Sequence, residues 1–302
     1  MSYLFGTSGP LSGGSGSQVI VKGIVSLEDG KKTVYEGISG LQPHIDSGDL
    51  ADLALGQVTI KVGKKSKVDD VFGILLSNSG DPQIETRGGN DTITGVVSVK
   101  AGKKSKVTDL AGIYESSDEP LETRDPSIVT GDDADTITGQ VTIKGKNLKA
   151  AYGDGIKNAV IDSGGGNDTV NAIGAGVAKP KASGDPSLQT SEGLDTTKLI
   201  LGDGEDFVFA RGASAGIKDA LIFAGEDNDT LDLHSGTGFV DGGSGDADRL
   251  ILSGDSTDFT FGPSPIGPYD RISDGDKTII DVTNVELFTF DNDTFTAAEL
   301  FA

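Results

Sequence analysis

Short stretches in which apolar and polar residues alternate recur along the chain. The stretch "GQVTIKVGKKSKVDD" at 56–70 returns as "GVVSVKAGKKSKVTD" at 95–109 and as "GQVTIKGKNLK" at 139–149, and "SQVIVKGIV" at 17–25 is a looser copy. Alternation with a period of two is typical of β-strands that have one buried face. Helical periodicity is nearly absent, and only "TAAELF" at 296–301 is suited to a helical turn. The pattern predicts an all-β fold.

A second repeat lies between these strands. "RGGNDTITG" at 87–95 recurs as "GDDADTITG" at 131–139, "GGGNDTVNA" at 164–172, "GDGEDFVFA" at 202–210, "GEDNDTLDL" at 225–233 and "GDADRLILS" at 245–253, with a weaker copy, "GDLADLALG", at 48–56. Each copy has a Gly/Asp/Asn turn, then an aspartate, one further residue and an apolar residue. The apolar residues should point inward: Ile93, Ile137, Val170, Val208, Leu231 and Leu250.

The spacing of the motif varies while the motif itself is kept. The aspartates Asp52, Asp91, Asp135, Asp168, Asp206, Asp229 and Asp248 lie between 19 and 44 residues apart. Such spacing is typical of stacked repeats that are constant on one side and carry insertions on the other. We therefore expect a right-handed parallel β-helix or β-roll solenoid over residues 1–245, with a surface loop at about 173–200. Residues 246–302 are richer in aromatic residues and should form a small C-terminal cap.

Composition narrows the classes of function. The formal net charge is −22, from 47 acidic and 25 basic residues, so the chain should bind neither nucleic acid nor anionic lipid. No stretch is long and apolar enough to predict insertion into a membrane. The absence of cysteine excludes disulfides and thiolate metal sites. Because the acidic residues are interleaved with β-branched pairs, the chain should fold rather than stay disordered, provided that cations neutralise its carboxylates.

The Gly/Asp turns have the chemistry of calcium sites. Calcium prefers six to eight oxygen ligands from carboxylates and backbone carbonyls, and glycine allows tight turns that expose carbonyls. Stacked turns bring carboxylates of adjacent repeats together, where a cation turns their repulsion into coordination. The sequence therefore predicts several Ca²⁺ ions, with these candidate ligands: Gly88, Gly89, Asn90, Asp91, Asp132, Asp133, Asp135, Gly165, Gly166, Asn167, Asp168, Asp203, Asp206, Asp227, Asp229, Asp246 and Asp248.

These turns resemble the RTX, or hemolysin-type, calcium-binding repeats over roughly residues 45–255. The match is specific at 88–93 and 165–170 and looser where aspartate replaces glycine, as at Asp132, Asp133 and Asp203. The segment "TNVELFTFDNDTF" at 283–295, with the apolar ending "ELFA", is similar to the closing segment of RTX proteins exported by type I secretion. This resemblance implies an extracellular or cell-surface location that is reached without an N-terminal signal peptide.

Lysines form a further regular feature. They cluster at 31–32, 64–67, 103–106 and 146–149, and would form one basic edge if the repeats stack in register. Such an edge could bind other copies of the chain or an anionic polysaccharide of the cell surface, or it could only be solvated. The leading hypothesis is a secreted calcium-binding structural protein that self-associates into a surface layer or filament. The alternative is a monomeric extracellular adhesin or polysaccharide-binding module.

An enzyme is not expected. The two histidines, His44 and His234, are isolated in the sequence, and no HExxH motif occurs. "IETR" at 84–87 and "LETR" at 121–124 place Arg87 and Arg124 in what look like corresponding positions. Repetition of this kind favours a stacked ladder of ion pairs over a catalytic arginine.

Overall fold

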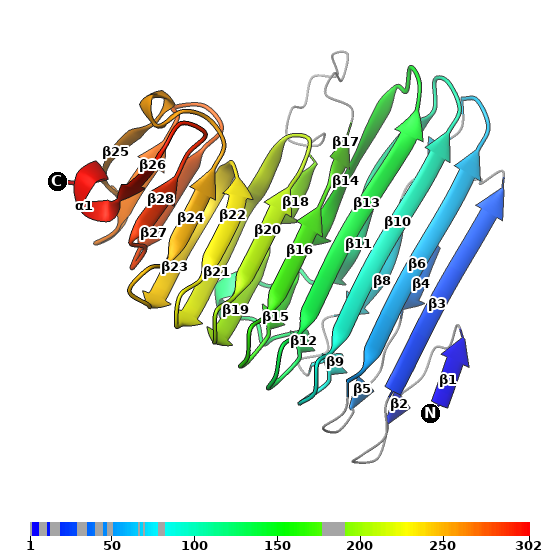
Figure 1. Cartoon of the computed structure of the whole chain (residues 1–302). Helices are drawn as coiled ribbons and strands as arrows, with labels where there is room; N and C mark the ends of the chain where they lie inside the picture. The colour runs from blue at the N-terminus through cyan, green and yellow to red at the C-terminus, as the bar shows by residue number, and fades with distance from the viewer. Residues whose placement is uncertain are drawn as a thin grey trace.

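The computed structural model describes residues 51–176, apart from 66, 69 and 78–81, and residues 191–302; within residues 1–50 it describes the backbone of five strands. Nearly all regular structure in these residues is β, and most strands pair in parallel (Figure 1). The predicted all-β class is therefore confirmed. The helical turn predicted near the C-terminus is α1 (Ala297–Leu300), the one α-helix of the described residues.

The first sheet contains eleven strands, all parallel except for the last pair. In spatial order they are β1 (Ser2–Phe5), β3 (Val19–Glu28), β6 (Leu53–Val62), β10 (Thr92–Ala101), β13 (Thr136–Gly145), β16 (Thr169–Ile173), β20 (Phe207–Arg211), β22 (Thr230–His234), β24 (Arg249–Leu252), β28 (Leu287–Thr289) and β29 (Thr294–Thr296). Spatial order follows chain order, so each strand pairs with the strand of the next repeat.

The second sheet takes the remaining strands. They are β2 (Leu11–Ser12), β4 (Tyr35–Ser39), β5 (Ile45–Asp46), β7 (Lys67–Val68), β8 (Val71–Ser77), β9 (Ile84–Glu85), β11 (Lys106–Ser116), β12 (Ile128–Val129), β14 (Ala150–Lys157), β15 (Val160–Asp162), β17 (Ala175–Gly176), β18 (Glu192–Asp195), β19 (Lys198–Asp203), β21 (Ala215–Glu226), β23 (Gly236–Ser244), β25 (Thr260–Pro263), β26 (Asp270–Ser273) and β27 (Ile279–Thr283). Antiparallel pairing is confined to β14–β17, β25–β26 and β26–β27 in this sheet.

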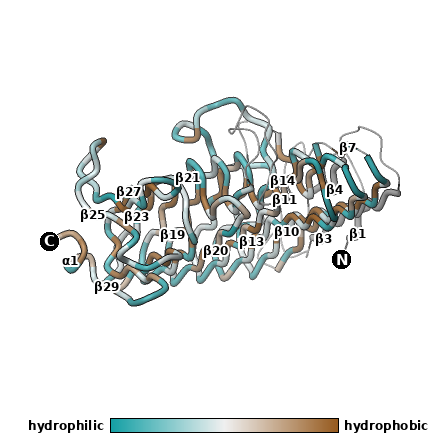
Figure 2. The backbone as a smooth tube through the Cα atoms, turned by 90° about the horizontal axis from the view of Figure 1, so that it is seen from above, coloured by the Kyte–Doolittle hydropathy of each residue, from teal (hydrophilic) through white to brown (hydrophobic). Residues whose placement is uncertain are grey.

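Repeats are numbered here by the aspartate that precedes each strand of the first sheet, so that repeat 1 begins at Asp52 and repeat 7 at Asp248. The register is regular: Ile93 of β10 pairs with Ala54 of β6 on one side and with Ile137 of β13 on the other. All six apolar residues predicted to point inward are at most 1% exposed. In Figure 2 hydrophobic and hydrophilic positions alternate along these strands.

A line of glycines divides the interior of the first repeats into two hydrophobic clusters. A Cβ placed on Gly56 would lie 2.1 Å from the carbonyl oxygen of Gly73, and one on Gly95 would lie 2.1 Å from that of Gly112. The two sheets therefore touch through their backbones at mid-strand. The larger cluster extends from repeat 1 to the C-terminal end of the stack, whereas the second contains residues of repeats 1–3, including Val58, Val97 and Val141.

Two features differ from or extend the predictions. The loop predicted at about 173–200 is wrong for residues 191–200, where β18 and the start of β19 pair in parallel with β14, β15 and β21. Their Glu, Gly and Asp residues are typical of loops, but β18 is buried along its whole length. At the C-terminal end, the antiparallel strands β25, β26 and β29 follow the parallel stack. No helix of the described residues is long and apolar enough to cross a membrane.

Candidate calcium site

The aspartates that begin the repeats form one continuous row, here called the aspartate row: Asp52, Asp91, Asp135, Asp168, Asp206, Asp229 and Asp248. Each is between 1 and 4% exposed. The carboxylate Oδ1 of each member from Asp91 onward accepts a hydrogen bond from the backbone N–H of the preceding member, at 2.7 to 2.8 Å. The last N–H, that of Asp248, donates to Glu286 Oε2 at 3.0 Å. One carboxylate oxygen of each residue from Asp91 to Asp248 therefore helps to join consecutive repeats.

The second carboxylate oxygen, Oδ2, is buried without a hydrogen-bond donor. The Oδ2 atoms of Asp91, Asp135, Asp168, Asp206, Asp229 and Asp248 accept no hydrogen bond. Hydroxyl groups lie beside three of these carboxylates, those of Thr86, Thr130 and Ser163. Each hydroxyl donates its own proton to a carbonyl of the next repeat, at 3.0 to 3.1 Å. A buried anionic oxygen without a donor is costly, so the row requires protons or cations.

The pKa values of the row express the same cost. Burial raises the pKa of Asp91 and Asp168 to about 7, of Asp135 to about 6 and of Asp206 to about 8. For Asp206 the neighbouring charges of Asp168 and Asp229 add to this effect. A carboxyl group in this range shares its site with a proton near neutral pH. Any cation that binds there competes with that proton.

The turns above the row can be built only with glycine at certain positions. Gly164, Gly202 and Gly225 have positive φ angles between 91° and 120°. A Cβ on Gly202 would also lie 1.6 Å from the carbonyl oxygen of Gly164 in the preceding turn. At the last turn, a Cβ on Gly245 would lie 2.6 Å from Asp248 Oδ1. At this last turn, backbone and aspartate carboxylate therefore lie close together.

The predicted ligands fall into three groups by exposure. The members of the aspartate row from Asp91 to Asp248 are buried, together with Gly88, whereas Gly89, Gly165 and Gly166 are half-buried in the turns. The other predicted ligands are exposed on the outside of the turns: Asn90, Asp132, Asp133, Asn167, Asp203, Asp227 and Asp246. Two of them bind turn backbone instead, because Asp133 Oδ2 accepts from Gly89 N–H at 3.0 Å and Asn167 Oδ1 accepts from Glu205 N–H at 3.3 Å.

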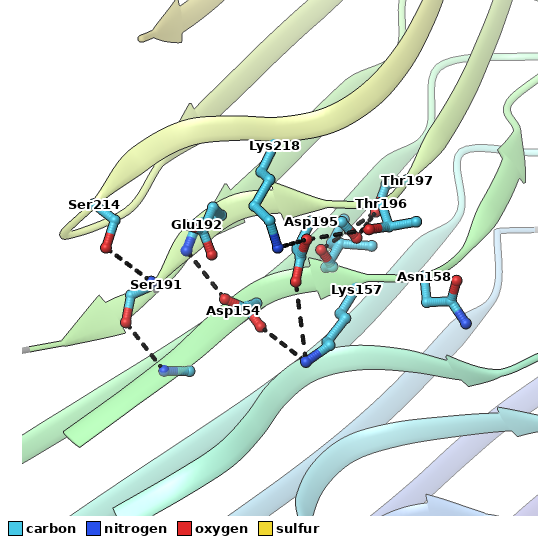
Figure 3. A network of polar contacts seen from close by, with 12 residues as sticks. Asp154, Lys157, Asn158, Ser191, Glu192, Asp195, Thr196, Thr197, Ser214 and Lys218 are labelled. Carbon is cyan, nitrogen blue, oxygen red and sulfur yellow. Dashed lines mark hydrogen bonds and ion pairs between the residues drawn. The ribbon is translucent and has the colours of Figure 1, made fainter. Parts of the chain in front are cut away.

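A separate acidic cluster was missed by the sequence analysis. Asp154 of β14 and Glu192 and Asp195 of β18 are all buried, and one carboxylate oxygen of each lies within 4.8 Å of the others (Figure 3). In the described residues this is the one group of three acidic side chains that close together. The residues are far apart in sequence and belong to no motif. No local pattern in the sequence marks them.

Two lysines bind this cluster. Lys218 Nζ lies 3.0 Å from Asp195 Oδ1, and Lys157 Nζ lies 3.5 Å from Asp154 Oδ2. Glu192 donates its backbone N–H to Asp154 Oδ1 at 3.0 Å, while its own Oε2 is buried without a hydrogen bond. Burial, followed by the charges of Asp154 and Asp195, raises the pKa of Glu192 to about 8. With Glu192 protonated, two ammonium groups balance two carboxylates, so the cluster is internally neutral without a metal ion.

The arginines of the "ETR" repeats are not equivalent in the structure. Ile84 pairs with Ile128, so the position that corresponds to Arg87 is occupied by Gly131 and not by Arg124. Arg124 is buried and forms an ion pair with Glu115 at 3.3 Å, whereas Arg87 is exposed and contacts Glu85 at 3.2 Å. The predicted ladder of ion pairs is therefore wrong, because the two Glu-Thr-Arg segments occupy different positions in their repeats.

Comparison with known proteins adds no assignment: no family model, curated protein or solved structure matches the chain.

Proposed function

We propose that this chain is a calcium-binding structural protein of the cell exterior: a right-handed parallel β-helix or β-roll solenoid that folds when calcium fills its Gly/Asp turns and then associates with further copies of itself. The observation that carries the proposal is the buried aspartate row, in which six Oδ2 atoms have no hydrogen-bond donor. Such a row is costly without a counter-charge, and a divalent cation that accepts irregular coordination by oxygen would stabilise it.

The residues of the row fit calcium in type and spacing. Parallel strands are about 4.8 Å apart, and calcium–oxygen distances are about 2.4 Å. A calcium ion between two repeats can therefore meet a carboxylate oxygen of each. We assign the coordination to the buried aspartates with turn carbonyls from residues such as Gly88, Gly165 and Gly166. Bound calcium would supply the positive charge that the row lacks.

Calcium binding would also couple folding to location. A site whose Kd is tenfold below the ambient calcium concentration adds about 1.4 kcal/mol to stability, and several such sites together reach the stability of a typical domain. In a cell interior with little calcium the acidic chain would have little stability and expand readily, and it would reach its full stability after export. The similarity of its turns and of residues 283–295 to RTX proteins supports this order of events.

The monomeric adhesin is the weaker alternative. Sugar-binding surfaces commonly present exposed aromatic rings, but the exposed large hydrophobic residues of the described part of the chain are Phe207, Ile266 and Ile279, and only one of these is aromatic. No specific observation therefore favours that alternative, and we retain the structural role.

The test is a calcium titration of protein purified in chelator. We expect isothermal titration calorimetry to detect several calcium ions per chain, and circular dichroism to show a rise of the thermal unfolding midpoint with calcium that magnesium at equal concentration does not reproduce. Magnesium is the matched control because it demands a stricter octahedral geometry. The absence of binding heat together with an unchanged midpoint would overturn the calcium assignment.

A further inference from the structure

Lysines gather on the turns that connect the two sheets in repeats 1–3. These turns follow β6, β10 and β13, at the opposite end of the first-sheet strands from the aspartate row. Residues 53–68, 92–108 and 136–153 contain no acidic residue. Their eleven lysines are all exposed and are here called the lysine edge: Lys61, Lys64, Lys65, Lys67, Lys100, Lys103, Lys104, Lys106, Lys144, Lys146 and Lys149. Lys31 and Lys32, in the same predicted series, lie outside the described residues.

The backbone holds the lysine edge in three regular levels. Lys61, Lys100 and Lys144 occupy the same register position of neighbouring strands. The turns themselves are joined, because Lys65 N–H donates to the Lys103 carbonyl at 3.0 Å and Lys104 N–H donates to the Asn147 carbonyl at 2.9 Å. The second hydrophobic cluster lies directly beneath these turns and packs against Leu148. The lysine edge is therefore a preorganised charged surface.

A surface of this kind needs an anionic partner. Within the described residues, Lys64, Lys103, Lys104 and Lys146 form no ion pair with an acidic side chain. Like charges at strand spacing repel one another, and this repulsion is relieved when a negatively charged surface binds. The regular spacing of about 4.8 Å between levels further favours a partner whose charges repeat at the same interval.

The same chain carries a surface that meets this requirement. The turns that lead into repeats 5, 6 and 7 expose five acidic side chains, here called the acidic edge: Asp203, Glu205, Glu226, Asp227 and Asp246. They are exposed on the turns and form no ion pair in the described part of the chain. The lysine edge and the acidic edge each span three consecutive repeats of the same stack.

We propose that the lysine edge of one copy docks on the acidic edge of a second copy, with the two stacks aligned in the same direction and shifted by four repeats, about 19 Å along the stack at strand spacing. The shift places repeats 1, 2 and 3 of one copy against the turns into repeats 5, 6 and 7 of the other. Without the shift, the lysines of repeat 2 would meet exposed Arg87. This inference rests on the proposed self-association and names its contact surface.

The contact is heterologous and generates an open array. The lysine edge and the acidic edge lie at opposite ends of the first-sheet strands, so each copy uses both surfaces at once. Copies related by translation alone cannot close into a ring, and they add indefinitely. The geometry therefore produces a staggered sheet and not a two-fold dimer.

Cysteine cross-linking tests the register, because the chain has no cysteine of its own. Lys103→Cys mixed with Asp227→Cys, treated with a short bis-maleimide in calcium, should give an intermolecular cross-link. Lys64→Cys mixed with Asp246→Cys is the matched control, since this pair is two repeats out of register. Lys103→Cys alone should not cross-link to itself. Equal yields from all three samples, or none from the first pair, would overturn the proposal.

A charge swap tests the chemistry. The variant Lys64→Glu/Lys103→Glu/Lys146→Glu and the variant Asp203→Lys/Asp227→Lys/Asp246→Lys should each need at least about tenfold more protein to associate in sedimentation velocity. Their equimolar mixture should associate again, because each variant then meets an opposite charge. Unchanged association of the single variants, or a mixture that stays dispersed, would contradict the docking.

Calcium binding separates this proposal from the one on which it rests. The lysine variant lies at the opposite end of the first-sheet strands from the aspartate row and its turns, so it should keep the calcium-dependent rise in unfolding midpoint. If both charge-swap variants associate as readily as the wild type, the docking surface is wrong and the calcium proposal is unaffected. A wild type that stays monomeric in calcium, while its lysine edge binds an anionic polysaccharide such as alginate, would overturn the docking in favour of a carbohydrate partner.

Discussion

The two carboxylate oxygens of a buried aspartate in the row have different environments. In Asp168, Oδ1 accepts the N–H of Asp135, whereas Oδ2 has no donor. The first bond gives the residue a structural role that any side chain with a carbonyl oxygen could perform. The second oxygen carries a desolvation cost that only a proton or a cation relieves. This asymmetry makes the two roles separable by substitution.

We expect Asp168→Asn to change stability in opposite directions with and without calcium. The amide keeps the oxygen that accepts from Asp135, but it removes the buried charge. In chelator at pH 8 the variant should be more stable than the wild type by about 1 to 3 kcal/mol, and in saturating calcium it should be less stable. Urea unfolding in both conditions measures the two differences. Asn171→Ala, on the half-exposed face of the same strand, is the control, and a change of the same sign in both conditions would refute the assignment.

The buried Glu192 should make the stability of the protein depend on pH. Burial and the charges of Asp154 and Asp195 raise its pKa from 4.5 to about 8 in the folded state. The folded protein therefore binds a proton that the unfolded chain releases, so stability falls as pH rises from about 4.5 to 8. Glu192→Gln should remove this part of the slope and be the more stable protein at pH 9. Unfolding midpoints at pH 5, 7 and 9 in chelator test it against exposed Glu122→Gln, whose slope should match the wild type.

At the scale of elements, close contact between the sheets depends on paired glycines. A Cβ on Gly95 would lie 2.1 Å from the carbonyl oxygen of Gly112, which is backbone and cannot rotate away. Gly95→Ala should therefore separate two strands and lower the free energy of unfolding by about 3 kcal/mol. Gly262→Ala is the matched control, since nothing lies within 4 Å of its added Cβ. Equal stability of the two variants in urea unfolding would show that the sheets do not touch there.

Strands were predictable where local pattern and tertiary environment agree. The alternation of "VTIK" in β6 and β13 and of "VSVK" in β10 predicted strands whose inward residues are buried, apart from the partly buried Ile143. β18 was missed because its Glu, Gly, Leu and Asp residues follow no alternation, and its acidic side chains are tolerated only through Lys157 and Lys218. These contacts join segments far apart in sequence, so no local pattern contains them.

The candidate site was predictable in part for a related reason. The motif identified the aspartates correctly as a repeated set, because their spacing to the inward apolar residue is constant. It could not separate Asp206, which is buried beneath the turn, from Asp203, which is exposed on it. The two share one residue type and one turn, and only the path of the backbone sends one side chain inward and the other toward solvent.

At the scale of the whole molecule, the C-terminal end of the stack is closed by a change in pairing. β29 runs antiparallel to β28 and is followed by α1, whose neighbour Phe301 packs against Phe288 and Phe261. A parallel stack that simply stopped would leave the backbone groups of its last strand free to pair with another chain. The antiparallel strand and the aromatic contacts cover that edge with residues of the same molecule.

Removal of residues 290–302 should therefore expose the C-terminal end of the stack and promote association through it. The truncated protein loses β29, α1 and the rings of Phe290, Phe295 and Phe301, which exposes β28 and the side chain of Phe288. In calcium we expect it to keep its β circular dichroism and to form large particles by light scattering within hours, at a concentration where the lysine-edge charge-swap variants stay dispersed. Adding Thr289→Lys to the truncation should suppress this growth, because a charge on an edge strand opposes pairing. If the truncated protein loses its β signal, the residues act in folding; if it stays folded and monodisperse, β29 and α1 do not protect the end.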